Sequence, residues 1–251
     1  MSESFTKEDR EKVSRFLSTV SLSEGVGVVE SPCSIAAINL ALTGVLNDER
    51  PPCMSPIIHR FIMEVQDAAG PEMRNSKEWK ALLPWAAGSL DEEEIEQERL
   101  LVIRDWMWDV VLPKVRPPER LKGAWATMLQ GRSQEAARAF REFSESLEDV
   151  SPDCHFAAAY AESAYDWKSE RLDSILTSSV LDCILSAAQQ VAGSLTDDVL
   201  AMAKQAMAKQ GLPVPATYKP VHDAIWRSFE PAALLRRLIG HPNGLPAGWD
   251  S

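Results

Sequence analysis

The sequence lacks the short motifs that identify most enzymes and nucleotide-binding proteins. Its 251 residues contain no nucleophile elbow, phosphate-binding loop, metal-ligand spacing or dinucleotide fingerprint. The four histidines are scattered, and four cysteines without Cys-x-x-Cys spacing stand at Cys33, Cys53, Cys154 and Cys183. We therefore expect buried reduced thiols, no bound metal and no cofactor.

Long apolar runs and an excess of basic residues are missing as well. The longest apolar stretch, residues 35–46, is far shorter than the roughly 20 residues that span a bilayer. The first eight residues lack the basic start and apolar run of a secretory signal. We expect no membrane segment and a cytoplasmic location. The net charge of -11 disfavours contact with a phosphate backbone, so no direct nucleic-acid binding is expected.

Helix signals, by contrast, recur along the whole chain. Thr6 and Asp9 resemble a capping box, and the Ser-Pro pairs at 31–32 and 55–56 are typical of a helix start. Three valines within residues 25–29 hint at one short strand, which is too little for a sheet. With 45% hydrophobic residues, the chain can bury a substantial core. The sequence predicts an all-α fold, an irregular multi-helix bundle of about eleven helices with short turns.

Several predicted boundaries depend on glycine and proline. A helix is expected from Ser31-Pro32 to Gly44, and another from Ser76 to Leu83, where Pro84 should break it. We also predict a long helix over residues 90–112 and two separate helices over 172–191 and 197–210. The whole chain, 1–251, is predicted to be a single helical domain. The prolines of 113–118 mark a candidate seam, and 240–251 should form an extended C-terminal tail.

The most charged segment, residues 89–109, carries eight acidic and two basic side chains. At 100° per residue, four of the carboxylates fall within about 60° of one another and form one acidic stripe. The members of this acidic stripe are Glu94, Glu98, Asp105 and Asp109, and Trp108 is predicted at its edge. A solvated helix face is the favoured interpretation. The alternative is a partner surface in which Trp108 supplies an aromatic contact.

Two further interpretations of the acidic stripe stay open. Asp105 and Asp109 are spaced as in some all-α enzymes that present a divalent metal to a diphosphate, although no second carboxylate motif accompanies them. A nucleic-acid mimic would instead need unpaired acids over a broad face. Residues 114–141 have a net charge of +5, so pairing between neighbouring helices is expected to neutralise part of the acidic stripe.

Arg74, Asn75 and Trp79 form a second group of candidate binding residues. Arginine and tryptophan dominate interface hot spots, so the three side chains could form a recognition surface. The favoured alternative is an internal network in which Arg74 pairs with Asp67 and Asn75 closes the turn before Ser76.

Parts of the sequence resemble a group of uncharacterised bacterial proteins. The resemblance is carried by Ser31-Pro32-Cys33-Ser34-Ile35-Ala36-Ala37, by Met73-Arg74-Asn75-Ser76 with Leu82-Leu83-Pro84, and by Trp106-Met107-Trp108. It implies a bacterial or mobile-element origin and carries no activity or site residue with it.

These observations favour a non-enzymatic module that binds another protein, as a regulator, inhibitor, immunity factor or complex subunit. A Mg²⁺-dependent all-α enzyme that uses the helix 90–112 is one alternative, and it requires a concave pocket at Asp105 and Asp109. An acidic nucleic-acid mimic or defence-system antagonist is another. A protein-binding module is expected to expose an apolar patch.

Overall fold

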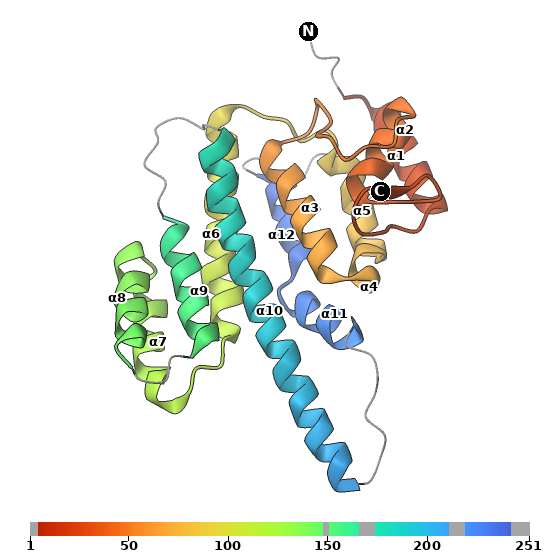
Figure 1. The fold of residues 1–251 in the computed structure, drawn as a ribbon. Helices are drawn as coiled ribbons and strands as arrows, with labels where there is room; N and C mark the ends of the chain where they lie inside the picture. Colours follow the sequence, from red (N-terminus) through yellow and green to blue (C-terminus); the bar gives the residue numbers. More distant parts are fainter. Residues whose placement is uncertain (1–4, 148–150, 166–173, 211–218, 242–251) are drawn as a thin grey trace. The chain divides into compact units, whose positions relative to one another are not determined.

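The computed structural model describes residues 5–147, 151–165, 174–210 and 219–241. These residues form α-helices, short π- and 3₁₀-helical turns and one two-stranded hairpin, so the predicted all-α class is confirmed (Figure 1). The chain divides into two compact units, which we call unit 1 (Met1–Val102 and Glu230–Ser251) and unit 2 (Ile103–Phe229). The division falls at 102/103 and 229/230 rather than at 113–118.

Unit 1 packs short helices around an apolar core formed largely by α3 and α5. Its elements are α1 (Lys7–Thr19), β1 (Gly27–Val28), β2 (Ser31–Pro32), α2 (Ser34–Thr43), α3 (Pro56–Ala69), α4 (Pro71–Arg74), α5 (Lys77–Ala86), the first part of α6 (Glu93–Trp106) and α12 (Pro231–Gly240). Although α12 follows unit 2 in the sequence, it packs on both α3 and α5. Phe61, Trp79 and Leu238 are fully buried. Burial of these side chains holds the unit together.

The helix starts of unit 1 follow their capping residues. Thr6 and Asp9 form a reciprocal capping box, with the Asp9 N–H donating to Thr6 Oγ1 and the Thr6 N–H donating to Asp9 Oδ2, both at 3.1 Å. Ser55 and Ser76 accept from the backbone at the starts of α3 and α5. Helix α2 ends at Gly44 in the left-handed conformation, as predicted.

Two predicted boundaries in unit 1 are wrong. Ser31-Pro32 does not begin a helix, because these residues form β2 and pair with β1. Helix α2 begins at Ser34 instead, where Cys33 Sγ accepts from the Ala36 N–H at 3.3 Å. Pro84 lies inside α5, which continues to Ala86. A proline near the end of a helix removes one hydrogen bond without preventing the last turn.

Unit 2 contains the longest helix of the described residues. Its elements are the end of α6, a π-helical turn η1 (Met107–Val111), the 3₁₀ turns η2 (Leu112–Lys114) and η3 (Glu119–Leu121), α7 (Lys122–Gly131), α8 (Gln134–Glu145), α9 (Pro152–Ser163), α10 (Ser174–Gln210) and α11 (Lys219–Ser228). The two helices predicted over 172–191 and 197–210 are one helix, α10, because no cap interrupts it. The long helix predicted over 90–112 begins at Glu93 as α6 and changes to π-helix at Met107.

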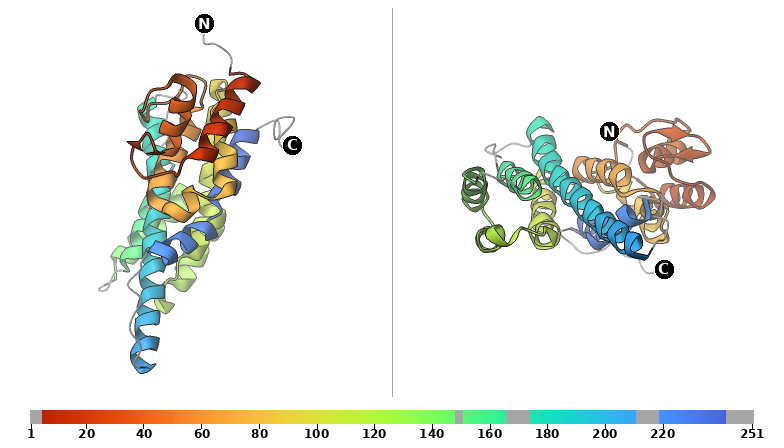
Figure 2. Two further views of the ribbon diagram at one scale, coloured as in Figure 1. Left: turned by 90° about the vertical axis from the view of Figure 1, so that its right-hand side faces the viewer. Right: turned by 60° about the horizontal axis from the view of Figure 1, so that its bottom comes forward.

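Within unit 2, neighbouring helices form antiparallel pairs. Helix α9 packs between α8 and α10, and α9 and α10 run side by side in opposite directions (Figures 1 and 2). In the part of the chain described here, no helix combines the length and hydropathy needed to cross a bilayer. Most of the predicted tail, from residue 242 onward, lies outside the described residues.

Candidate functional site

Two adjacent valines are exposed at the tip of the β1–β2 hairpin in unit 1. Val28 pairs with Ser31 across the hairpin, so Val29 and Glu30 form the turn. The exposed fractions of Val28 and Val29 are 57% and 52%. Single exposed apolar residues are ordinary, but the tips of tight turns usually carry Gly, Asn, Asp, Pro or Ser. An apolar pair at this position is therefore a candidate contact surface.

The turn at the hairpin tip is not one that forms easily by itself. Two-residue hairpins favour type I′ or II′ turns, which need positive φ angles at one or both turn residues. Neither Val29 nor Glu30 has a positive φ. An isolated two-stranded hairpin is also marginal in water. Contacts from the rest of unit 1 must therefore hold the hairpin in place.

Asn75 supplies the first of these contacts. Its Oδ1 accepts from the Leu22 N–H at 2.7 Å, and its Nδ2 donates to the Leu22 carbonyl at 2.9 Å. The same Nδ2 donates to the Pro71 carbonyl at 3.0 Å. The side chain thus pairs with the backbone entering the hairpin as a neighbouring strand would, which anchors that backbone to α4.

Arg74 and Asp67 supply the second and third contacts. Arg74, only 3% exposed, donates to the Gln66 carbonyl at 2.9 Å and forms an ion pair with Glu24 at 3.4 Å. Asp67 accepts from the Gly25 N–H at 3.1 Å. Arg74 is thus part of an internal network, but the predicted pair with Asp67 is wrong. Asp67 holds the hairpin backbone directly.

Serines and one glycine fix the hairpin from within. Ser23 Oγ donates to the Ser31 carbonyl at 2.7 Å, and Ser31 Oγ donates to the Ser21 carbonyl at 2.9 Å. Gly27 has a φ of 74°, and a Cβ there would collide with Ser31 O and Ser23 Oγ. Only glycine fits this position without distorting the hairpin.

Trp79 lies in the core of unit 1. It is completely buried, and its indole N–H donates to Ser34 Oγ at 3.2 Å. Its ring is therefore not part of the surface, and the role of Trp79 in this structure is to support α2 and α5.

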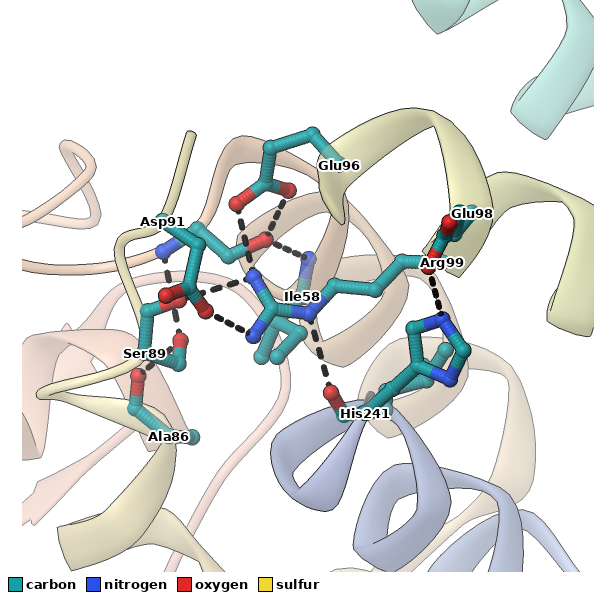
Figure 3. A network of polar contacts seen from close by, with 10 residues as sticks. Ile58, Ala86, Ser89, Asp91, Glu96, Glu98, Arg99 and His241 are labelled. Atoms are coloured by element: carbon teal, nitrogen blue, oxygen red, sulfur yellow. Dashed lines mark hydrogen bonds and ion pairs between the residues drawn. The ribbon is translucent and has the colours of Figure 1, made fainter. Parts of the chain in front are cut away.

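The acidic stripe is exposed, but most of it is paired. In unit 1, Glu94 is exposed, and Glu98 Oε2 lies 2.7 Å from His241 Nε2 (Figure 3). In unit 2, Arg132 contacts Asp109 at 2.6 Å and Asp105 at 3.3 Å. The contacts of Arg132 are the neutralisation expected from the basic segment 114–141.

Trp108 is buried and does not lie at the edge of the acidic stripe. Its exposed fraction is 3%, and its ring packs against Tyr165 with centroids 6.4 Å apart. Trp108 falls within the π-helical turn η1, where the 100° spacing of an α-helix no longer applies. The side chain therefore turns inward, and the predicted aromatic surface contact is absent from this structure.

A buried polar network around Arg99 in unit 1 was not predicted from the sequence. Arg99 is 1% exposed and uses all three of its side-chain nitrogens (Figure 3). Nε donates to the Leu238 carbonyl of α12 at 2.9 Å, Nη1 to Ser89 O and Glu96, and Nη2 to Asp91 at 2.5 Å. Arg99 therefore ties α12 to α6 and to the segment before it.

Glu96 is the buried carboxylate of this network. It accepts from Arg99 Nη1 at 2.7 Å and from Ser55 Oγ, which also caps α3. Burial raises the pKa of Glu96, and the Ser55 hydrogen bond and the Arg99 charge only partly oppose this effect. Because these partners are all internal, we interpret the network as structural.

Comparison with family models, with curated proteins and with solved structures gave no match. Among the described residues, no group of three or more His, Cys, Asp or Glu side chains is arranged to hold a metal ion. Function is therefore inferred from geometry. Val28 and Val29 were missed as candidates at the sequence level, although a valine pair between Gly27 and the polar Glu30-Ser31 was the signal to notice.

Proposed function

We propose that this protein binds another protein through the hairpin surface, which we define as Glu24, Val28, Val29 and Glu30. The observation that carries the proposal is the exposed valine pair on an anchored turn. Exposed apolar side chains with a polar rim are typical of protein contact sites. The proposed role is that of a regulator, inhibitor or subunit, without catalysis.

Preorganisation supports this role. Binding costs free energy when a loop must be ordered, and a loop that is already fixed avoids that cost. Asn75, Asp67 and Gly27 fix the backbone of the hairpin before any partner arrives. The anchored geometry would therefore let a small apolar contact contribute to affinity.

The charges beside the valines indicate what the partner carries. Glu30 is exposed in the turn itself, and Glu24 is exposed before β1, where it also pairs with Arg74. A basic rim on the partner would complement them and raise the association rate. The Mg²⁺-dependent enzyme and the nucleic-acid mimic have less support. Both would need free carboxylates at Asp105 and Asp109, and Arg132 pairs with both of these residues.

Site-specific crosslinking in native host cells tests the proposal. A photo-reactive amino acid at Val29 should crosslink to a partner protein. The matched control is Val45, also 52% exposed and in unit 1 but outside the hairpin. A discrete crosslinked species at Val29 and none at Val45 is expected. Equal crosslinking at the two positions, or none at Val29, would contradict the proposal.

Two variants then separate contact from anchoring. The double variant Val28→Ser/Val29→Ser should keep the melting temperature within about 2 °C and lose the partner identified by crosslinking. Asn75→Ala leaves both valines in place and should weaken the same partner by releasing the backbone at Leu22. Undiminished partner binding by the double variant would contradict the proposal.

A further inference from the structure

A polar groove lies between α9 and α10, entirely within unit 2. Its volume is about 350 Å³, within the size range of small-molecule sites. Its lining residues are Asp153, Tyr160, Ser186, Gln189, Gln190, Gly193, Ser194 and Asp197. Every lining side chain carries a hydroxyl, amide or carboxylate, apart from Gly193, and none of them is basic. Such a lining suits a ligand with many hydrogen-bonding groups and a positive charge.

The groove is long and has two different ends. From Ser186 to Asp197 the lining follows α10 for about 16 Å. Asp153 accepts from Gln190 at 3.1 Å and from Ser194 at 2.7 Å, which places it toward the Asp197 end. Tyr160 lies two turns further along the antiparallel α9, toward Ser186. Carboxylates therefore gather at one end, and hydroxyl and amide groups at the other.

Gly193 gives independent support for a ligand-binding role of this groove. It lies in the interior of α10, where glycine is among the least favourable residues. Its φ is not positive, and a Cβ at this position would meet no atom within 4 Å. Neither backbone conformation nor helix packing accounts for the glycine. Its effect is to keep the floor of the groove free of a side chain.

The free carboxylate points to a cationic ligand. Within the described part of the chain, Asp197 is exposed and has no hydrogen bond or ion pair. Asp153 is already held by Gln190 and Ser194, so its charge is fixed in the groove. An ammonium group near these two carboxylates and hydroxyl groups along the rest of the groove would satisfy both ends.

We propose that the α9–α10 groove binds a short oligosaccharide that contains amino sugar. The length of the groove accommodates more than one sugar ring, and the amides and hydroxyls pair with the ring hydroxyls. The carboxylate end binds the ammonium group. This inference is independent of the hairpin surface, which lies in unit 1.

Matched ligands test the chemical class. The glucosamine trimer and cellotriose share length and linkage and differ in the ammonium groups, and spermidine carries ammonium groups without hydroxyls. Titration followed by NMR should show the glucosamine trimer binding at least about tenfold more tightly than either comparison ligand. Equal affinity of cellotriose would overturn the role of the carboxylates, and equal affinity of spermidine would overturn the role of the hydroxyls.

Two neighbouring carboxylates distinguish binding in the groove from general attraction of a cation to an acidic protein. Asp197 lines the groove and Asp198 does not, although both are exposed on α10. Asp197→Asn should weaken the glucosamine trimer at least about fivefold, whereas Asp198→Asn, with the same change in net charge, should alter it less than about twofold. Equal effects of the two variants would show general attraction to an acidic protein and would overturn the site.

A pair of glycines tests the groove floor. Gly193→Ala and Gly123→Ala both place a methyl group in open space on a helix. Gly193→Ala should raise the melting temperature by up to about 2–4 °C, because alanine favours a helix interior, and Gly123→Ala, in the first turn of α7, should raise it by less. Only Gly193→Ala should weaken binding of the glucosamine trimer. Unchanged binding by Gly193→Ala would contradict the proposed site even if the other variants behaved as expected.

Discussion

Arg99 in unit 1 and Arg132 in unit 2 each hold two carboxylates, but in opposite surroundings. The Arg99 side chain is 1% exposed and the Arg132 side chain is 42% exposed. Water screens the charges around Arg132, so those ion pairs add little to stability. Arg99 and Glu96 have lost most of their water and depend on each other, whereas Asp91 remains 45% exposed. The ion pairs of Arg99 therefore matter more for the stability of unit 1 than those of Arg132 do for unit 2.

The largest expected effect tests the buried side of this comparison. Arg99→Ala leaves the buried Glu96 without its cation and the Leu238 carbonyl without its donor. We expect unit 1 to lose about 3–5 kcal/mol of stability. The check is the urea unfolding midpoint, followed by circular dichroism and by tryptophan fluorescence. A loss below about 1 kcal/mol would show that water reaches the network and would remove the contrast with Arg132.

A smaller loss of stability is expected at Arg132. The backbone of this residue is strained, so the replacement residue matters as well as the lost side chain. Arg132 caps α7 with a φ of 43°, a conformation that favours glycine. Arg132→Ala should change stability by less than about 1 kcal/mol, since only exposed ion pairs are lost. Arg132→Gly should be more stable than Arg132→Ala by up to about 1 kcal/mol. The reverse order in thermal unfolding would show that the ion pairs to Asp105 and Asp109 matter more than the strain.

The smallest expected effect is a difference in pH dependence between the units. The pKa of Glu96 is raised above 4.5 by burial, so its contribution to stability is present below pH 4.5 and is lost as pH rises through the raised value. In unit 2, burial of Glu162 is outweighed by hydrogen bonds from Arg141 and Arg138, so its pKa is lowered. That contribution is present above pH 4.5 and is lost as pH falls through the lowered value.

Glutamine variants distinguish the two opposite pH dependences of stability. Relative to wild type, Glu96→Gln should gain stability as pH rises from about 5 to 7, and Glu162→Gln should lose stability as pH rises from about 3 to 5. Urea midpoints across this range are the measurement. If both variants follow the same trend with pH, the two carboxyl groups do not differ in the way their surroundings indicate.

Much of the helical fold follows from local chemistry in the sequence. The Thr6 capping box, the Ser55-Pro56 start and the Gly44 stop all act within one turn of the chain, and each is confirmed. Ser31-Pro32 has the same local signal as Ser55-Pro56 and forms a strand instead. The difference is tertiary, because Asp67 and Asn75 hold the backbone that enters the hairpin in which Ser31 and Pro32 pair.

The candidate sites were harder to predict because their partners are distant in sequence. The exposure of Glu94, Glu98, Asp105 and Asp109 follows from helical periodicity. Their particular partners do not, since Arg132 is 23 residues from Asp109 and His241 is 143 residues from Glu98. Trp108 was misplaced for a different reason. The π-helical turn η1 alters the angle per residue, and no proline or glycine in the sequence marks it.

The return of α12 to unit 1 has a consequence for synthesis on the ribosome. The contacts of α12 with α3, α5 and Arg99 cannot form until residues 103–229 have been translated. Unit 2 can therefore complete its folding before α12 is available to pack on the helices of unit 1, which are translated earlier. The nascent chain would expose the apolar faces of α3 and α5 during that interval, and chaperones would find their binding sites there.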